Sequence, residues 1–244
     1  MFKYLRVEIE KLNRSKVLLF GFLLIIFICT GVSIFEFRYI QFGISETFYI
    51  DFMLYSTTFV VIKVIVPILV LLLAASVWGG EYSDGMIKSF LLCKVGKTRM
   101  FAGKLILLIL TSAASVLTAF ITFTAISALK SGAGISPDSV LSMAKVYAVT
   151  IIGLLPILLM TVFASIVFGH FQKGFSLGAV LLFLSISLDS VIDNAYMTPT
   201  YFLSNSYVIY TSEAHSAYLI IPVLYAVLLT VAGITAFKIK DIWQ

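Results

Sequence analysis

Six long apolar runs decide what this chain can fold into. Each holds about 18 or more residues with almost no charge, and together they occupy more than half of the 244 residues. Crossing about 30 Å of hydrocarbon at about 1.5 Å per residue requires a helix of about 20 such residues. We therefore predict spanning helices at residues 17–35, 57–78, 105–129, 143–168, 174–192 and 219–237.

The composition of the whole chain agrees with a membrane location. Apolar residues make up 61% of the sequence and charged residues 12%, against about 45–50% and about 25% in ordinary soluble domains. A membrane β-barrel would instead show segments of about 10 residues with alternating polarity. Runs such as IVPILVLLLAA do not alternate. The sequence thus predicts one all-α integral membrane domain over residues 1–244.

Lys and Arg are distributed unevenly, and their distribution predicts the orientation. Thirteen of the 17 lie in residues 1–16, in residues 79–104, at Lys173 and after the last span. Positive charge is concentrated on the cytoplasmic side of membrane proteins. We therefore expect both termini and residues 79–104 in the cytoplasm. The net charge of +5 is read as a consequence of topology, and no nucleic-acid partner is expected.

Two segments outside the spans have patterns of their own. Residues 1–16 carry apolar residues at helical spacing, which predicts an amphipathic helix lying in the cytoplasmic lipid interface. A disordered basic tail is the alternative. Residues 193–218 contain five tyrosines and no Lys or Arg, as expected at the outer membrane boundary. Re-entrant backbone there requires burial in protein or contact with a wet cavity.

Few titratable residues fall inside or near the predicted spans. Lys63 is an intramembrane cation, and such residues are functional candidates by default. It also lies close enough to the external end of its span to snorkel to water. Asp189 and Asp193 stand four residues apart, which would place both carboxylates on one helix face. These three residues are candidates for a substrate path, with snorkelling and a solvated helix end as the alternatives.

We find no pattern for catalysis or metal binding in the sequence. The two histidines are expected on opposite sides of the membrane, and the two cysteines have no ligand spacing. Residues 95–98, VGKT, look like the end of a phosphate-binding loop, but Leu91 stands where its first glycine should be. We therefore expect no catalytic residue, no metal and no cofactor bound by this chain.

Residues 79–104, GGEYSDGMIKSFLLCKVGKTRMFAGK, are far longer than a simple turn between two spans requires. Ser83 or Asp84 is placed to cap a short helix here. One side of that helix is apolar at helical spacing and holds Met86, Ile87, Phe90 and Leu91. Such a helix, held between two spans, is suited to press an apolar knob into a cytoplasmic partner. A surface helix that only lies on lipid is the alternative.

This stretch resembles the cytoplasmic loop of ABC-2 type transporter permeases, in which a Glu, a Gly, a Leu-Leu pair, an Arg and a Lys recur in that order. The matching residues are Glu81, Gly85, Leu91, Leu92, Arg99 and Lys104. Met86 departs from the usual Thr, and Lys94 departs from the usual Pro. The amphipathic start, the six spans and the long external segment also fit, so the resemblance covers essentially the whole chain.

The resemblance implies that residues 79–104 hold a coupling helix that seats in a cytoplasmic ABC ATPase subunit. The contact residues that it implies are Glu81, Asp84, Gly85, Met86, Ile87, Lys88, Phe90, Leu91 and Arg99. It also implies two paired permease subunits in a bacterial plasma membrane, ATP and Mg²⁺ bound by the partner ATPase, and short re-entrant helices in residues 193–218.

We therefore expect the membrane subunit of an ABC exporter whose cargo is an amphipathic peptide, an antibiotic or a lipid-like molecule. Sodium or another ion is the alternative cargo. An ion-coupled secondary carrier using Lys63, Asp189 and Asp193 is a second hypothesis, although no inverted repeats are visible. A third is a scaffold or sensor in which residues 79–104 bind something other than an ATPase.

Overall fold

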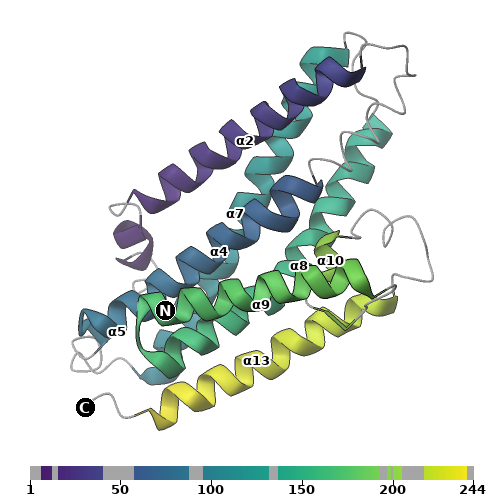
Figure 1. Cartoon of the computed structure of the whole chain (residues 1–244). Coiled ribbons are helices and arrows are strands. Elements are labelled where there is room, and N and C mark those ends of the chain that lie inside the picture. The colour runs from purple at the N-terminus through teal and green to yellow at the C-terminus, as the bar shows by residue number, and fades with distance from the viewer. Residues whose placement is uncertain are drawn as a thin grey trace.

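Long helices make up most of the described part of the chain, and none of its residues lies in a β-strand. The computed structural model describes residues 7–12, 16–40, 58–87, 96–131, 137–192, 197–198, 200–204 and 217–240. Their order along the chain and their packing are shown in Figure 1.

The helices follow one another with few interruptions. After helical residues 7–12 come α2 (Val17–Ile40), α4 (Val66–Ala75), α5 (Glu81–Ser83), α7 (Lys97–Ser131), α8 (Pro137–Phe168), α9 (Phe171–Val191), α10 (Tyr201–Ser204) and α13 (Ile220–Ile239). Two π-helical stretches, η1 (Thr58–Ile65) and η2 (Ser76–Gly80), flank α4, and a 3₁₀ turn, η3 (Ala217–Leu219), precedes α13. Because η1, α4, η2 and α5 join without a gap, residues 58–83 form one continuous helical segment.

Five of the described helical segments are long and apolar enough to cross a membrane. They are Val61–Ser83, Lys97–Leu129, Met143–Phe168, Phe171–Asp189 and Ile220–Ile239. They correspond to the second to sixth predicted spans, so the expectation of an all-α membrane protein is confirmed. In α2 the apolar section is shorter and covers Leu18–Ile34. The sixth spanning helix therefore stays a prediction.

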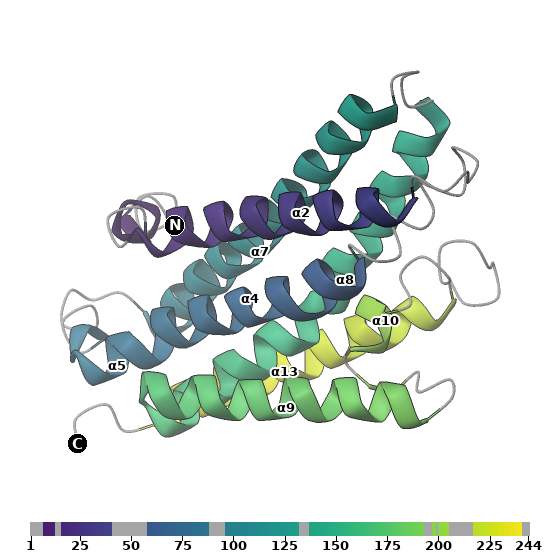
Figure 2. The ribbon, with the colours of Figure 1, turned by 45° about the horizontal axis from the view of Figure 1, so that its top comes forward.

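The core lies around α4 and α8. In Figure 2 these two helices lie between α2 on one side and α9 and α13 on the other. In the span containing α4, 67% of the 18 most apolar consecutive residues are buried, and in the span containing α8 the share is 61%. In α9 and in α13 it is 17%. Most of the exposed side chains of α9 and α13 are apolar, as contact with hydrocarbon favours.

Close helix contacts are made by small residues. A Cβ added at Gly174 of α9 would lie 2.2 Å from Ser165 Oγ of α8, and one at Gly178 would lie 2.7 Å from Thr161 Oγ1. At the end of the helical segment 58–83, Gly79 would meet the Phe171 backbone at 2.7 Å. These glycines let α9 approach its neighbours closely, as is common between membrane helices.

The ends of the predicted connection 79–104 differ from expectation. The helix of the second span continues to Ser83, and α7 begins at Lys97 instead of residue 105. Ser83 Oγ donates a hydrogen bond back to the Gly80 carbonyl at 2.7 Å and Asp84 caps the C-terminus of α5, so both residues end the helix of the second span. Residues 86–87 are helical again, and the short helix predicted here stays a prediction. Gly85, with φ of +69°, ends the helix in the left-handed conformation. Residues 88–95 lie outside the described residues.

Candidate functional site

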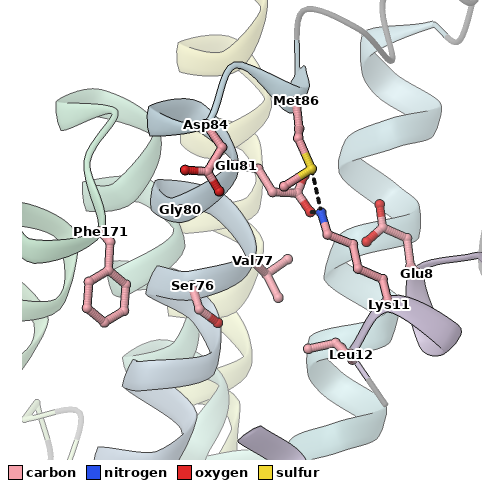
Figure 3. A pocket seen from close by; sticks show the side chains of 10 residues that line it. All are labelled: Glu8, Lys11, Leu12, Ser76, Val77, Gly80, Glu81, Asp84, Met86 and Phe171. Carbon is pink, nitrogen blue, oxygen red and sulfur yellow. Dashed lines mark hydrogen bonds and ion pairs between the residues drawn. The ribbon is translucent and has the colours of Figure 1, made fainter. Parts of the chain in front are cut away.

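Four charged side chains from three separate elements meet at the end of the bundle where α5 ends, which we call the α5 end. Glu8 and Lys11 come from helical residues 7–12, Glu81 from α5 and Lys104 from the second turn of α7. Lys104, Glu8 and Glu81 are 0%, 1% and 3% exposed, and Lys11 is partly exposed. We call these four residues the charge cluster. Figure 3 shows Glu8, Lys11 and Glu81 turned toward one another.

The Glu81 carboxylate joins the two lysines of the charge cluster. Its Oε2 accepts a hydrogen bond from Lys104 Nζ, and its Oε1 accepts one from Lys11 Nζ. Lys104 Nζ also donates to the Val77 carbonyl at 3.3 Å and lies 3.4 Å from Glu8 Oε1. Two carboxylates therefore face two ammonium groups. This balance is what allows charges to remain away from water, since an unpaired buried charge costs several kcal/mol.

Aromatic rings cover the buried side of the charge cluster. Trp78 lies between Phe101 of α7 and Phe237 of α13, with ring centroids 5.3 and 5.2 Å apart. Lys104 Nζ is 5.7 Å from the centroid of the Trp78 ring, within the range of a cation–π interaction. These rings exclude water from the Lys104–Glu81 pair and tie it to both α7 and α13.

Lys240, which directly follows α13, connects the end of this helix to the α8–α9 turn. Lys240 Nζ donates hydrogen bonds to the carbonyls of Ile166 and, at 3.1 Å, Val167, and it lies 4.5 Å from the centroid of the Tyr82 ring. It thus satisfies carbonyls at the C-terminus of α8, where a cation is favoured. Burial lowers the pKa of the Lys240 ammonium.

A pocket of about 260 Å³ opens beside the charge cluster. Helical residues 7–12 form one wall, and Phe171 at the start of α9 lies on the other side (Figure 3). The floor is the end of the helical segment 58–83, from Ser76 to Asp84. Lys11 Nζ, which reaches across this pocket to Glu81, also lies 3.4 Å from Met86 Sδ.

The contact residues implied by the resemblance fall in different surroundings. Glu81 and Ile87 are buried within the chain, Gly85 and Met86 are half-buried, and Asp84 and Arg99 are exposed. Lys88, Phe90 and Leu91 lie outside the described residues. Of the implied contacts, Asp84 and Arg99 are thus the described residues most open to a partner, whereas Glu81 is occupied by the charge cluster.

The substrate-path candidates lie toward the opposite end of the bundle, which we call the α10 end. Lys63 is 7% exposed within η1, and η1 packs against α10. Asp189, near the end of α9, accepts side-chain hydrogen bonds from Thr198 and Thr200, just before α10. Asp193 lies outside the described residues. Lys63 and Asp189 therefore both belong to elements that contact α10.

Sequence reasoning did not identify most of the charge cluster. The sequence pattern did not single out Glu8 or Lys11, although their spacing of three residues places them on one helix face. Lys104 was recognised only as the last residue of a motif. No group of three or more His, Cys, Asp or Glu residues within the described ranges could hold a metal ion.

Comparison with known proteins supports the resemblance. The family described as ABC-2 family transporter protein matches residues 4–189 of the chain. The match therefore includes all four residues of the charge cluster and extends through most of α9. None of the curated proteins compared with the chain matches it.

Proposed function

Since the chain belongs to the ABC-2 family of transporter proteins, we propose that it is the permease subunit of an ATP-driven exporter. A separate cytoplasmic ATPase subunit binds ATP and Mg²⁺, and this chain supplies the membrane path. Two permease subunits, copies of this chain or relatives, pair in the plasma membrane of a bacterium. ATP-driven closure of the ATPase subunits moves residues 79–104 of each permease.

The observation that carries this proposal is the attachment of residues 79–104 to the rest of the chain. Glu81, near the start of this segment, accepts hydrogen bonds from Lys104 of α7 and from Lys11 of residues 7–12. A force on the segment is therefore passed to α7, to the N-terminal helix and to the segment 58–83 together. The buried pairing makes this joint stiff, because separating its charges in a dry site is costly.

The proposed topology has six spans with both termini in the cytoplasm. The lysines of the α5 end, namely Lys11, Lys97, Lys104, Lys173, Lys238 and Lys240, then lie on the cytoplasmic side, as the positive-inside rule requires. The apolar section of α2, Leu18–Ile34, measures about 25 Å at about 1.5 Å per residue. That length lies at the short end of the range for spanning helices.

The proposed cargo is an amphipathic peptide, an antibiotic or a lipid-like molecule, with sodium or another ion as the alternative. A strain lacking the gene is expected to become sensitive to membrane-active peptides and to keep its tolerance of sodium. Loss of sodium tolerance alone would point to the ion.

Ion-coupled carriage is the second candidate function, because Lys63 is buried in η1 and Asp189 is held beside α10. In this candidate the two residues would bind or release the coupling ion. Its transport would persist when every cytoplasmic ATPase is removed, which separates it from the exporter.

The first experiment is detergent co-purification of the full chain with the ATPases encoded beside it, followed by ATPase assays. Wild type is expected to retain an ATPase, and Phe90→Asp, on the predicted apolar side of the coupling helix, is expected to lose it. Leu129→Asn, at an exposed position far from the α5 end, is the matched control. Retention of the ATPase by Phe90→Asp, or no ATPase with wild type, would reject coupling through this segment.

A further inference from the structure

The pocket beside the charge cluster has a charge that its own residues do not balance. Glu8, Glu81 and Asp84 line it, and among the described residues Lys11 is the only lysine that lines it. Lys11 and Lys104 are occupied by Glu81, and Lys104 is also the ion-pair partner of Glu8. The Asp84 carboxylate forms no ion pair with a described residue. Three carboxylates and two ammonium groups thus leave one negative charge at the pocket mouth.

Asp84 lies between two helical stretches. It caps the C-terminus of the helical segment 58–83, and residues 86–87 are helical again beyond Gly85. The Asp84 side chain is exposed and lines the pocket, so a partner can reach it.

A second acidic oxygen in the pocket lacks a hydrogen-bond donor. Glu8 is 1% exposed, and its Oε1 accepts no hydrogen bond in the described part of the chain. Its contact with Lys104 Nζ, at 3.4 Å, is an ion pair without aligned hydrogen bonding. Glu8 therefore adds negative charge behind the pocket wall, while the exposed Asp84 carries the unbalanced charge at the pocket mouth.

The shape of the pocket suits a long side chain with a charged head. Leu12, Val77 and Phe171 offer apolar surface for a methylene stem. Gly80 on the floor is open, because an added Cβ would meet no described atom within 4 Å. Arginine and lysine combine such a stem with the donors that carboxylates accept.

We propose that this pocket receives one cationic side chain, an arginine or a lysine, from the cytoplasmic ATPase subunit. The inference rests on the proposed function, which places the α5 end in the cytoplasm and an ATPase against it. The incoming cation pairs with Asp84 and lies beside Glu81. Docking thus places a partner charge in contact with the charge cluster that joins α7 and the N-terminal helix.

The test measures the affinity of the purified ATPase subunit for the full chain in lipid nanodiscs. Asp84→Asn removes the unbalanced charge, and Gly80→Leu adds a side chain to the pocket floor at a position where its Cβ meets no described atom within 4 Å. Each is expected to weaken binding by about tenfold or more, the range seen when one member of an interfacial charge pair is removed. Asp84→Asn should also reduce the dependence of affinity on salt. Glu10→Gln, exposed on the N-terminal helix, is the matched control and should bind as wild type.

The outcomes separate this inference from the function on which it rests. If wild type binds no ATPase, the proposed function fails. If wild type binds and both variants bind equally tightly, the pocket inference fails and the proposed function stands. As a direct check, Asp84→Arg should lose binding and regain it with one Arg→Glu or Lys→Glu change in the ATPase. Lack of rescue across all exposed basic residues of the ATPase would overturn the pairing.

Discussion

At the α5 end Glu81 accepts hydrogen bonds from two ammonium groups, whereas at the α10 end Asp189 accepts them from two threonine hydroxyls. Glu81 and its partner Lys104 are buried, and Asp189 is half-buried. At the α5 end, charged groups of both signs are buried together. Removing one of them leaves its partner buried without a counter-charge, which costs several kcal/mol. At the α10 end the hydroxyls are neutral, and each can be lost separately.

This contrast predicts a stiff joint and a releasable contact. The charge cluster unites three elements that are far apart in the sequence. The contacts of Asp189 instead hold the short segment that leads into α10 against the end of α9. Hydrogen bonds from hydroxyls to a carboxylate are expected to open and close with a modest change in free energy.

The largest effect is expected for Lys104→Met, which leaves Glu81 and Glu8 buried without Lys104. Breaking a buried ion pair in this way typically costs about 3–5 kcal/mol of unfolding free energy. The measurement is reversible unfolding in mixed micelles with increasing SDS. The double variant Lys104→Met with Glu81→Gln should cost less than the single one, because the carboxylate charge is removed too. Arg99→Gln, exposed on α7, is the control, and an equal loss there would contradict a stiff joint.

The next effect is expected at a pair of neighbouring glycines beside the charge cluster. Gly79→Ala places a Cβ 2.7 Å from the Phe171 backbone and should destabilise the protein by about 1–3 kcal/mol. Gly80→Ala meets nothing within 4 Å and should be neutral or slightly stabilising. The same SDS titration compares them. Equal stability of the two variants would show that α9 does not depend on close approach to η2.

A smaller effect is expected for Thr198→Val at the α10 end, because it removes one hydrogen bond to Asp189. The expected loss is about 1.5 kcal/mol, the low end for a hydrogen bond to a charged group, because Thr200 still donates to Asp189. It should be concentrated in faster hydrogen exchange of α10 amides, with exchange in α7 unchanged. Thr118→Val is the control, since the Thr118 hydroxyl bonds only to the carbonyl of Ala114 within its own helix. Faster exchange at both ends would contradict the independence of the α10 contact.

The smallest effect concerns pH and Lys240. Because burial lowers the pKa of Lys240 in the folded protein below its usual 10.5, the unfolded chain binds more protons between those two values. The free energy of unfolding of wild type should therefore rise relative to that of Lys240→Met as the pH increases through this window. Unfolding in SDS at stepped alkaline pH measures the difference. A falling difference would mean that the folded protein favours the charged form.

Some features of the site were visible in the sequence, and others were not. The resemblance singled out Glu81, Gly85 and Lys104 by their order in one local motif. It gave no sign that Glu81 is buried, or that Lys11, 70 residues away in sequence, is its partner. A lysine in a basic tail and a lysine in an ion pair have the same local pattern. The pattern therefore could not distinguish a lipid-facing N-terminal helix from one that packs on α7.

The limits of the connection 79–104 show the same difference. Its polar residues placed residues 97–104 outside the third predicted span. In the structure these residues belong to α7, and two of their lysines have partners on other helices: Lys97 with the Lys238 carbonyl and Lys104 with Glu81. A span that is predicted from polarity alone ends at the edge of the hydrocarbon layer. Helix boundaries follow hydrogen bonds and packing, which the sequence does not display.

The class of protein and the positions of its long helices follow from the sequence alone. Their lengths and apolar content follow from the thickness and polarity of the bilayer, and each is a property of one continuous segment. Only the tertiary structure decided that Glu8, Lys11, Glu81 and Lys104 meet, and that Asp84 keeps an unbalanced charge beside a pocket. These features depend on distances between separate helices, which are set by the packing of side chains such as Trp78 and Phe237.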